Sequence, residues 1–319
     1  MQKKSYEIKL GKLSLLLLLV TLLVISCNKD DDGDEFITVP IRDRTEQQLA
    51  DNDSILKYLN SHYYNSQQIE GIANPSVSDI IITKFAEGET VAPDGHTKLS
   101  DPGVVETKSV VFADTDYELY VLELNKGGGS KSPEFSDNVL VKYEGFTLDD
   151  EVFDSAVNPV EFDLLSLIPA WNKVLPDFNI AESFVENADG TVSYINQGLG
   201  VMFVPSGLAY FSRPTNGIPA YSPIIFKFGL LQTSTNDHDN DGIPSYLEDL
   251  NGDKDFNVNF ENLEDTTDDD TDGDGTPDYA DNDDDGDGIL TINEDTNNDG
   301  DPTNDIGSNG IPKYLDPNE

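Results

Sequence analysis

The stretch VLVKYEGFTLDDEVFDS, at residues 139–155, decides the fold that we expect for this chain. Its first half alternates, which places Val139, Val141 and Tyr143 on one face of a predicted strand. A turn around Asp149 follows, and a second apolar run comes after it. Aromatic and branched residues therefore gather between turn signals, and a small half-open β-sheet with an apolar pocket is the physical expectation.

Short motifs continue in a fixed order beyond this stretch. They read V-x-Y-x-G, F-D-S, P-x-x-F, I-x-x-W, A-Y and I-P, with a phenylalanine in the last apolar run. Their residues are Val141, Tyr143, Gly145, Phe153, Asp154, Ser155, Pro159, Phe162, Ile168, Trp171, Ala209, Tyr210, Ile218, Pro219 and Phe226. This ordered set, across about ninety residues and roughly a third of the chain, resembles the FKBP-type peptidyl-prolyl cis-trans isomerases. The resemblance implies an α+β domain at residues 115–233, in which an FKBP-like antiparallel β-sheet wraps on a short helix.

The resemblance also implies a proline-binding pocket. Trp171 would form its floor, and Asp154 would be hydrogen-bonded to Tyr143 near the substrate carbonyl. The Ile168 amide and the Tyr210 hydroxyl would hold the peptide. The walls would be Tyr143, Phe153, Val160, Ile168, Tyr210 and Phe226. Each residue taken alone also fits a plainer role, since aromatic side chains fill ordinary cores and an aspartate caps turns.

Isomerisation of a proline peptide bond needs a shaped site rather than a nucleophile, a metal or a cofactor. The amide rotates over a barrier of about 18–20 kcal/mol because twisting breaks its resonance. A concave apolar pocket that favours the twisted amide lowers this barrier. Two residues depart from the family pattern. Val160 replaces an aromatic wall, which predicts a wider pocket, and Phe211 replaces a glycine after Tyr210, which predicts an altered loop.

The charge balance excludes several classes of partner. The 319 residues include 19 Lys and Arg against 62 Asp and Glu, which gives a net charge of −43. Nucleic acid is excluded because phosphate binding needs a basic surface. Attraction to anionic lipid head groups is excluded for the same reason. Divalent cations are the partners that such a charge favours.

The N-terminus predicts export and lipid anchoring. Lysines precede an apolar run at residues 13–25, which is the pattern of a secretory signal peptide at residues 1–27 and is too short for a spanning helix. Residues 24–27, VISC, resemble a bacterial lipobox, in which Cys27 receives the lipid and anchors the protein to the membrane. The NKDDD that follows resembles a tag for the outer face of the outer membrane. A plain acidic linker and a periplasm-facing lipoprotein are the alternatives.

The acidic residues concentrate at residues 236–319, which hold 28 acidic side chains and two lysines. Acidic runs are usually disordered, but three segments match the calcium-loop spacing D-x-[DN]-x-[DN]-G-x5-E, one of them with aspartate at the end. Alternate carboxylates converge on one ion when such a loop wraps it, and Ca²⁺ takes about six to eight oxygens. The predicted ligands are Asp237, Asp239, Asp241, Glu248, Asp270, Asp272, Asp274, Asp281, Asp283, Asp285, Asp287 and Glu294.

A looser copy of the loop at residues 305–316 carries NGIPKYLD, which echoes DGIPSYLED and DGTPDYAD and marks an internal repeat. The flanks lack the long amphipathic helices of EF-hand sensors, and the region resembles thrombospondin type 3-like calcium repeats instead. The resemblance implies a structural role for Ca²⁺. Plain acidic disorder is the alternative.

The chain before the predicted sheet divides into an acidic tether at residues 28–44 and a helical and mixed segment at residues 45–114. The helix is predicted to begin at Thr45, in a capping-box pattern. Its predicted apolar stripe consists of Leu49, Leu56 and Tyr63, spaced seven residues apart, with Ile55, Leu59 and Asn60 nearby.

Further strands are predicted at residues 80–85, 104–112 and 117–124. An insertion at residues 184–200 departs from the family pattern, and the Asp189-Gly190 turn in it predicts a β-hairpin near one rim of the sheet.

These features predict a membrane-tethered, exported isomerase or folding helper that acts on proline-containing polypeptides. The alternative is a non-enzymatic surface protein that uses the FKBP-like fold as a binding platform and the calcium-stiffened tail as a spacer or adhesive. A third hypothesis is a calcium-dependent periplasmic chaperone without isomerase activity. The sequence predicts no oligomeric state.

Overall fold

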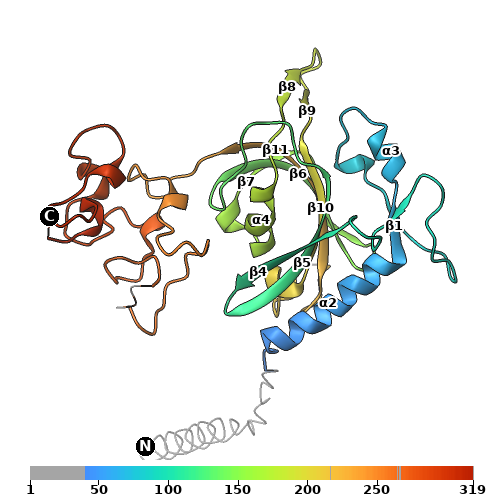
Figure 1. Cartoon of the computed structure of the whole chain (residues 1–319), viewed down its shortest axis with the longest axis horizontal. Helices are drawn as coiled ribbons and strands as arrows, with labels where there is room; N and C mark the ends of the chain where they lie inside the picture. Colours follow the sequence, from blue (N-terminus) through green and yellow to red (C-terminus); the bar gives the residue numbers. More distant parts are fainter. Residues whose placement is uncertain (1–39, 216, 264, 266, 319) are drawn as a thin grey trace, which may run out of the picture. The chain divides into compact units, whose positions relative to one another are not determined.

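The computed structural model describes residues 40–318, apart from residues 216, 264 and 266 (Figure 1). The predicted signal peptide, the predicted lipid site at Cys27 and most of the predicted tether lie outside the described residues. Within the described residues, no helix has the length and apolar character needed to cross a membrane. The described chain from residue 42 onward belongs to one compact unit.

A six-stranded antiparallel sheet lies at the centre of this unit, in the order β4-β5-β10-β11-β6-β7 (Figure 1). Its strands are β4 (Glu106–Phe112), β5 (Thr115–Asn125), β6 (Asn138–Thr147), β7 (Val152–Asp163), β10 (Gly198–Val204) and β11 (Ile224–Ser234). The predicted alternation is confirmed in β5, where Tyr117 and Leu119 face one core and Leu122 faces the other. It is also confirmed in β6, where Val139 and Val141 are buried together.

The sheet is covered on both faces. One face packs on the short helix α4 (Pro169–Val174), and this core holds Trp171 and Phe226. The other face packs on the N-terminal helix α2 (Arg44–Ser61), and this second core holds Ile55 and Leu59. Because apolar side chains project from both faces of the sheet, each face needs a cover. The prediction of an FKBP-like antiparallel sheet on a short helix, preceded by a helical extension, is therefore confirmed.

Helix α2 differs from its prediction in two respects. It begins at Arg44 with Asp43 as its N-cap, because the Asp43 side chain accepts a hydrogen bond from the Glu46 amide at 2.9 Å, so the cap predicted at Thr45 is wrong. The predicted stripe is confirmed only in part, since Ile55 and Leu59 are buried, whereas Leu49 is 66% exposed and Leu56 is 44% exposed. The buried face consists of Gln47, Gln48, Asp51, Ile55, Tyr58 and Leu59. Half of this face is polar, because it meets polar loops as well as the core.

A small sheet follows α2, in the order β2-β1-β3. Its strands are β1 (His62–Tyr64), β2 (Ile82–Lys84) and β3 (Thr97–Lys98), and the short helices α3 (Ser66–Glu70) and η1 (Val77–Asp79) lie between them in sequence. The strand predicted at residues 80–85 is thus shorter than expected.

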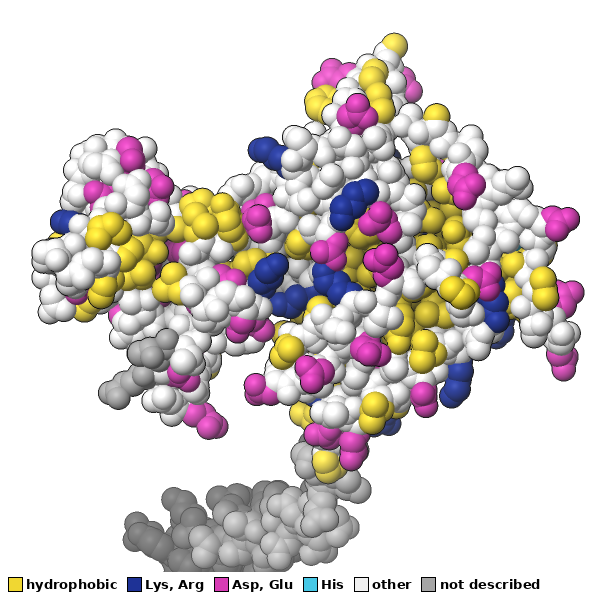
Figure 2. Space-filling model, viewed as in Figure 1, with side chains coloured by type: hydrophobic (Ala, Val, Ile, Leu, Met, Phe, Trp, Pro, Cys, Tyr) yellow, Lys and Arg dark blue, Asp and Glu magenta, His cyan; other side chains and the backbone are white. Residues whose placement is uncertain are grey.

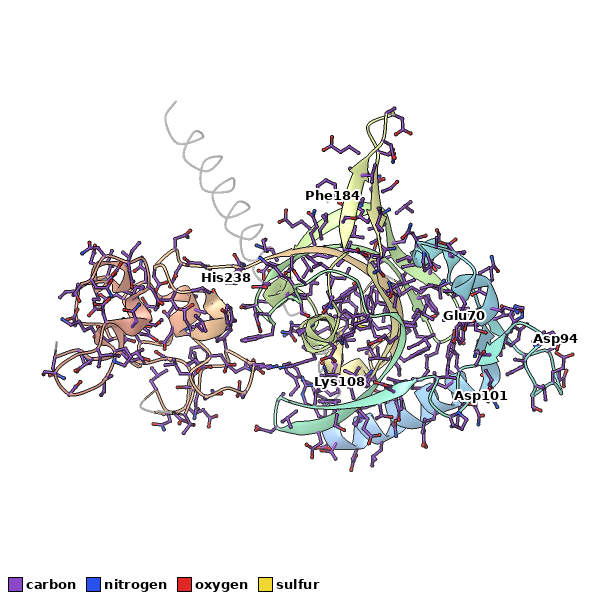
Figure 3. All side chains as sticks on the ribbon, turned by 45° about the horizontal axis from the view of Figure 1, so that its top comes forward. Glu70, Asp94, Asp101, Lys108, Phe184 and His238 are labelled. Carbon is purple, nitrogen blue, oxygen red and sulfur yellow. The ribbon has the colours of Figure 1, made fainter. Side chains whose placement is uncertain are left out.

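The predicted insertion forms a hairpin of β8 (Ser183–Glu186) and β9 (Val192–Ile195), which confirms the prediction (Figure 3). Gly190, in its turn, has a φ of +84°, a conformation that glycine adopts without strain. Phe184 is 52% exposed on this hairpin.

Residues 236–318 contain no strand and no helix longer than one turn among the described residues, which agrees with the predicted lack of long amphipathic helices. Single 3₁₀ turns recur through the chain instead, and they are η2 (Leu164–Ser166), η3 (Leu175–Asp177), η4 (Ser206–Leu208), η5 (Ser245–Leu247), η6 (Asp278–Ala280), η7 (Thr291–Asn293), η8 (Pro302–Asn304) and η9 (Lys313–Leu315). The last five fall in the acidic region, and they separate loops of similar backbone geometry.

Candidate functional site

Four elements bring an aromatic cluster together between the sheet and α4. Trp171 from α4 lies 5.1 Å from Phe226 of β11 between ring centroids. Phe153 from β7 meets the same Phe226 ring edge-on at 5.5 Å, and Tyr143 from β6 lies 5.9 Å from Trp171. Trp171 and Phe226 are buried, whereas Tyr143 and Phe153 are half-buried. These four predicted pocket residues therefore form one apolar surface with an accessible edge.

The glycine of the V-x-Y-x-G motif allows this cluster to form. A Cβ atom at Gly145 would lie 2.6 Å from the Phe226 ring and 2.7 Å from the Phe153 ring. Only a residue without a side chain lets both rings lie across the strand at this position.

Asp154 is held in place by Tyr143. The Tyr143 hydroxyl donates a 2.6 Å hydrogen bond to Asp154 Oδ2, and the Ser155 amide donates a 2.8 Å bond to Oδ1. Burial and the neighbouring Asp154 carboxylate raise the pKa of Tyr143, so the phenol stays protonated and remains the donor. An exposed carboxylate with a fixed orientation thus stands at the edge of the aromatic cluster.

The other predicted wall residues, Val160, Ile168 and Tyr210, also pack against this core and are half-buried. Ile168 is the N-cap of α4. Burial and the charge of Asp154 raise the pKa of Tyr210, which places its phenol in the field of the same carboxylate. The sequence did not assign Phe162 to the site, although its ring lies 5.8 Å from Tyr143. Its position in the P-x-x-F motif was the available signal.

Phe211 occupies a backbone conformation that favours glycine, with a φ of +48°. Its ring lies 4.3 Å beneath the Arg44 guanidinium and 5.2 Å from the Tyr221 ring. The loop after Tyr210 therefore accommodates a phenylalanine through contacts with Arg44 of α2 and with Tyr221, further along the same loop.

A second candidate site lies in the acidic region. Asp239, Asp241 and Glu248 converge as their spacing predicts, and Asp284 from a later loop joins them, with one oxygen of each within 4.8 Å of the others. Glu248 is 0% exposed and Asp284 is 1% exposed. Both oxygens of each lack a hydrogen-bond partner. Such carboxylates could hold a cation, because burying unpaired charge is costly and a bound cation would offset that cost.

Electrostatics agree with this geometry. Burial, reinforced by neighbouring carboxylates, raises the pKa of Glu248 to about 10 and that of Asp284 to about 10. The same causes raise the pKa of Asp239 to about 8. A divalent cation would offset the repulsion that adds to the effect of burial, and hard carboxylate oxygens are the ligands that Ca²⁺ prefers.

Asp237, a predicted ligand, is not in this group. Its carboxylate accepts hydrogen bonds from the amides of Asn240 at 2.7 Å and Gly242 at 3.2 Å. Asp270 accepts bonds in the same way, from Gly273 and Gly275. The first aspartate of each of these two loops therefore fixes its turn through backbone hydrogen bonds.

Two further predicted groups converge, one from each remaining loop. They are Asp270, Asp272 and Asp274, and Asp283, Asp285 and Asp287. The predicted closing residues Asp281 and Glu294 lie outside these groups. The sequence missed a further group, Asp249, Asp253 and Asp269, whose signal was the shorter phrase DLNGD.

The sequence has distant relatives among FKBP-type isomerases. It is 30% identical over 172 residues to the FKBP-type peptidyl-prolyl cis-trans isomerase FkpA of Escherichia coli (strain K12), a match that covers 52% of this chain and 57% of that protein. It is 27% identical over 177 residues to the outer membrane protein MIP of Legionella longbeachae, a match that covers 52% of this chain and 65% of that protein. The chain thus spans less than two thirds of the length of these relatives, and the homology to FKBP-type isomerases is distant.

Two other comparisons complete this picture. The crystal structure of FkpA from Escherichia coli aligns with a TM-score of 0.33 and 25% sequence identity, over 43% of this chain and 55% of that chain. Residues 238–318 match the model of the BamM C-terminal family. The acidic region therefore has relatives of its own.

Proposed function

We propose that the protein is an FKBP-type peptidyl-prolyl cis-trans isomerase that helps exported, proline-containing polypeptides to fold. The observation that carries the proposal is the 2.6 Å hydrogen bond from Tyr143 to Asp154, at the edge of the cluster of Trp171 and Phe226. The distant FKBP-type homology supports the same activity.

In this proposal the residues bind and twist the substrate without covalent chemistry. The proline ring packs on Trp171 and Phe226, and Tyr143 and Phe153 enclose it. The twisted amide is less charge-separated than the planar one, so an apolar surface favours it. Asp154 faces the substrate carbonyl, and Tyr210 and the Ile168 amide hold the flanking peptide. Catalysis then rests on binding the twisted state more tightly than the planar one.

A protease-coupled proline isomerisation assay on residues 28–319 tests this activity. We expect the Asp154→Asn variant to lose about tenfold or more in kcat/KM, equivalent to about 1.4 kcal/mol of transition-state stabilisation. Asp189→Asn is the matched control, because Asp189 is an exposed aspartate in the turn of the β8–β9 hairpin. A wild-type protein that is folded but does not accelerate isomerisation would falsify the enzymatic proposal.

The same assay separates the second candidate, a non-enzymatic binding platform. The observation that favours it is Val160, a small side chain where an aromatic wall was expected, half-buried against the core. A wider pocket still binds a proline segment, but it encloses the twisted amide less closely than a pocket with an aromatic wall and so stabilises that state less. Binding of a proline peptide, followed through the single tryptophan Trp171, without rate enhancement would support this candidate.

We further propose that a lipid on Cys27 holds the protein at the outer membrane, facing the cell surface, with a periplasm-facing position as the alternative. The lipobox-like VISC motif and the similarity to the outer membrane protein MIP support an envelope location. Protease shaving of intact cells distinguishes the two orientations. Labelling with a radioactive fatty acid, lost in Cys27→Ser, tests the anchor.

We propose that Ca²⁺ has a structural role in residues 236–319. The buried group of Asp239, Asp241, Glu248 and Asp284 supports it. Extracellular calcium modules bind at about 10⁻⁴ to 10⁻³ M, which suits a permanently loaded spacer rather than a sensor. Calcium titration calorimetry tests this role, and an absence of heat at millimolar Ca²⁺ would contradict it.

A further inference from the structure

Helix α2 presents polar side chains to the domain, although helices that cover a core usually present apolar ones. Asp51 is 1% exposed, and Gln47 is 5% exposed. A buried carboxylate is costly unless it is hydrogen-bonded. The partners of these side chains lie in one loop near the proposed proline site, and the C-terminal end of the same helix binds a second loop.

The first loop, residues 205–221, is bound by Asp51. Its Oδ2 atom accepts bonds from the Ser206 amide at 2.7 Å and from the Ser206 hydroxyl at 2.6 Å. Its Oδ1 atom accepts a bond from Gln47 Nε2 at 2.6 Å. The start of this loop is therefore fixed to the helix by fully buried bonds.

Arg44 holds the same loop further along. Its guanidinium lies 4.3 Å over the Phe211 ring and donates a 3.2 Å bond to the Gly207 carbonyl. Phe211 has a φ of +48°, a conformation that a residue with a side chain adopts only when its surroundings hold it. The cation–π contact with Arg44 supplies such a constraint.

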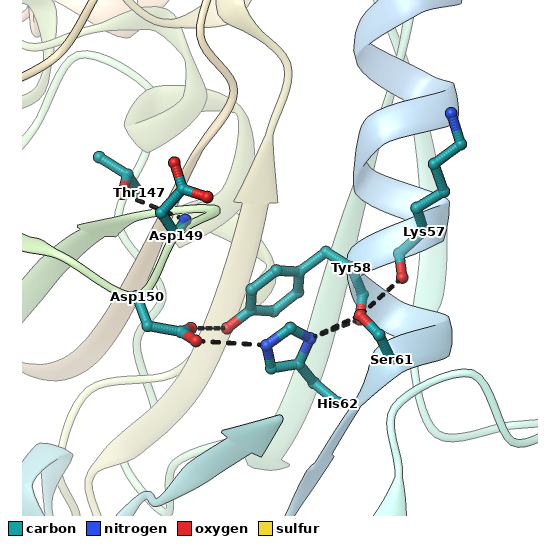
Figure 4. Close-up of polar contacts among 7 residues, drawn as sticks. All are labelled: Lys57, Tyr58, Ser61, His62, Thr147, Asp149 and Asp150. Carbon is teal, nitrogen blue, oxygen red and sulfur yellow. Dashed lines mark hydrogen bonds and ion pairs between the residues drawn. The ribbon is translucent and has the colours of Figure 1, made fainter. Parts of the chain in front are cut away.

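The second loop is the turn between β6 and β7, and the C-terminal end of α2 binds it (Figure 4). The Tyr58 hydroxyl donates a 2.7 Å bond to Asp150 Oδ1, and His62 Nε2 lies 3.3 Å from Asp150 Oδ2. The Tyr58 and His62 rings stack at 3.7 Å. Asp150 has a φ of +62°, so this turn is also held in a strained conformation.

The first loop carries a residue of the proposed site, and the second leads directly into two others. Tyr210 directly precedes Phe211, and Phe153 and Asp154, at the start of β7, follow Asp150 by three and four positions. The first loop also meets β7, because a Cβ atom at Gly217 would lie 3.4 Å from Phe153 Cβ. We propose that α2 is a positioning element of the isomerase site, in which Arg44, Asp51 and Tyr58 hold the loops that place Tyr210, Phe153 and Asp154. The inference rests on the proposed function, and none of the three holding residues touches substrate.

The plainer role of α2 is to cover the second core through Ile55 and Leu59. The two roles differ in what a variant changes. Loss of core cover lowers the stability of the whole domain, whereas loss of a loop contact loosens residues 205–221 selectively. Ile55→Val is the stability control, since it trims the core and leaves every loop bond in place.

The test compares Arg44→Ala with Lys57→Ala, which removes an exposed positive charge from the same helix. Hydrogen–deuterium exchange reports on residues 205–221 without reference to catalysis. We expect Arg44→Ala to raise the exchange rate of residues 205–221 by about tenfold or more and to lower kcat/KM by a similar factor. The controls Lys57→Ala and Ile55→Val should leave the ratio between the exchange rate of this loop and that of the whole domain unchanged.

A double-mutant cycle with Phe211→Gly sharpens the test. Glycine adopts a positive φ without a constraint, so Arg44→Ala should then lower kcat/KM by about threefold or less. Equal losses in both backgrounds, or exchange in residues 205–221 that Arg44→Ala leaves unchanged, would overturn the inference. If the wild-type protein shows no isomerisation, the proposed function fails, and the exchange measurements still decide whether α2 holds the loop.

Discussion

The two regions of the molecule show opposite relations between burial and polarity. In the sheet domain most of the fully buried side chains are apolar, such as Phe203 and Phe228. In the acidic region Asp241 is 1% exposed and Glu248 is 0% exposed, while Ile292 is 51% exposed. Apolar side chains accordingly appear at the surface of that region (Figure 2). The first region is stabilised by removing apolar surface from water, and the second needs its carboxylates neutralised.

Removal of Ca²⁺ should produce the largest difference between the two regions. We expect a chelator to unfold residues 236–318, because four carboxylates within 4.8 Å repel one another without a cation. The sheet domain should remain folded, since its cores contain no such group among the described residues. Limited proteolysis with mass spectrometry measures both outcomes. Equal protection of the acidic region from protease with and without chelator would show that this region does not need Ca²⁺ to fold.

Phe228→Ala tests the opposite side of the comparison. Phe228 is 0% exposed and packs edge-on against Phe178 at 4.9 Å. We expect the free energy of unfolding of the sheet domain to fall by about 3–5 kcal/mol, because the change removes a large buried ring. Denaturant melts give this value, and calorimetric calcium stoichiometry serves as the control. A changed stoichiometry would show that the two regions do not fold by separate means.

The effect of Asp284→Asn on the acidic region should have opposite signs with and without Ca²⁺. In calcium it removes a ligand from the buried group, and we expect an affinity loss of about tenfold or more, equivalent to about 1.4 kcal/mol. In chelator the folded region must either bury the charge of Asp284 or take up a proton there, as its raised pKa shows, and asparagine removes this cost, so the acidic region should become more resistant to protease. Asp237→Asn is the matched control, since Asp237 holds a turn and lies outside the group. The same sign in both conditions would contradict a cation site.

The smallest effect is expected where the two regions touch. Lys173 of α4 donates a 2.7 Å bond to the Lys254 carbonyl, and the Phe135 and Phe256 rings lie 5.2 Å apart. Burial lowers the pKa of Lys173, and the nearby Asp255 and Asp253 oppose this shift. We expect Lys173→Met to reduce the stabilisation of the sheet domain by Ca²⁺ by about 1 kcal/mol. Thermal melts with and without Ca²⁺ measure it, and an unchanged calcium-induced shift would mean that this contact carries no coupling.

Much of the sheet domain could be predicted from the sequence, whereas the start of α2 could not. In the sheet domain, alternation in β5 and β6 and the order of short motifs were sufficient, because local period and neighbouring strands determine a hairpin. The bond from Tyr143 to Asp154 was anticipated through the resemblance to the FKBP-type isomerases. The cap of α2 was missed because Asp43 and Thr45 are both good N-cap residues, and their sequence patterns compete.

The sequence alone determined where the aromatic cluster and the acidic loops would form. Each loop shapes itself through bonds such as those from Asn240 and Gly242 to Asp237. Only the tertiary structure decided that Asp284 joins Glu248, and that Arg44 lies over Phe211. Asp284 follows Glu248 by 36 residues, and Phe211 follows Arg44 by 167. Contacts of this separation depend on how packed elements meet, and no local period or spacing encodes that meeting.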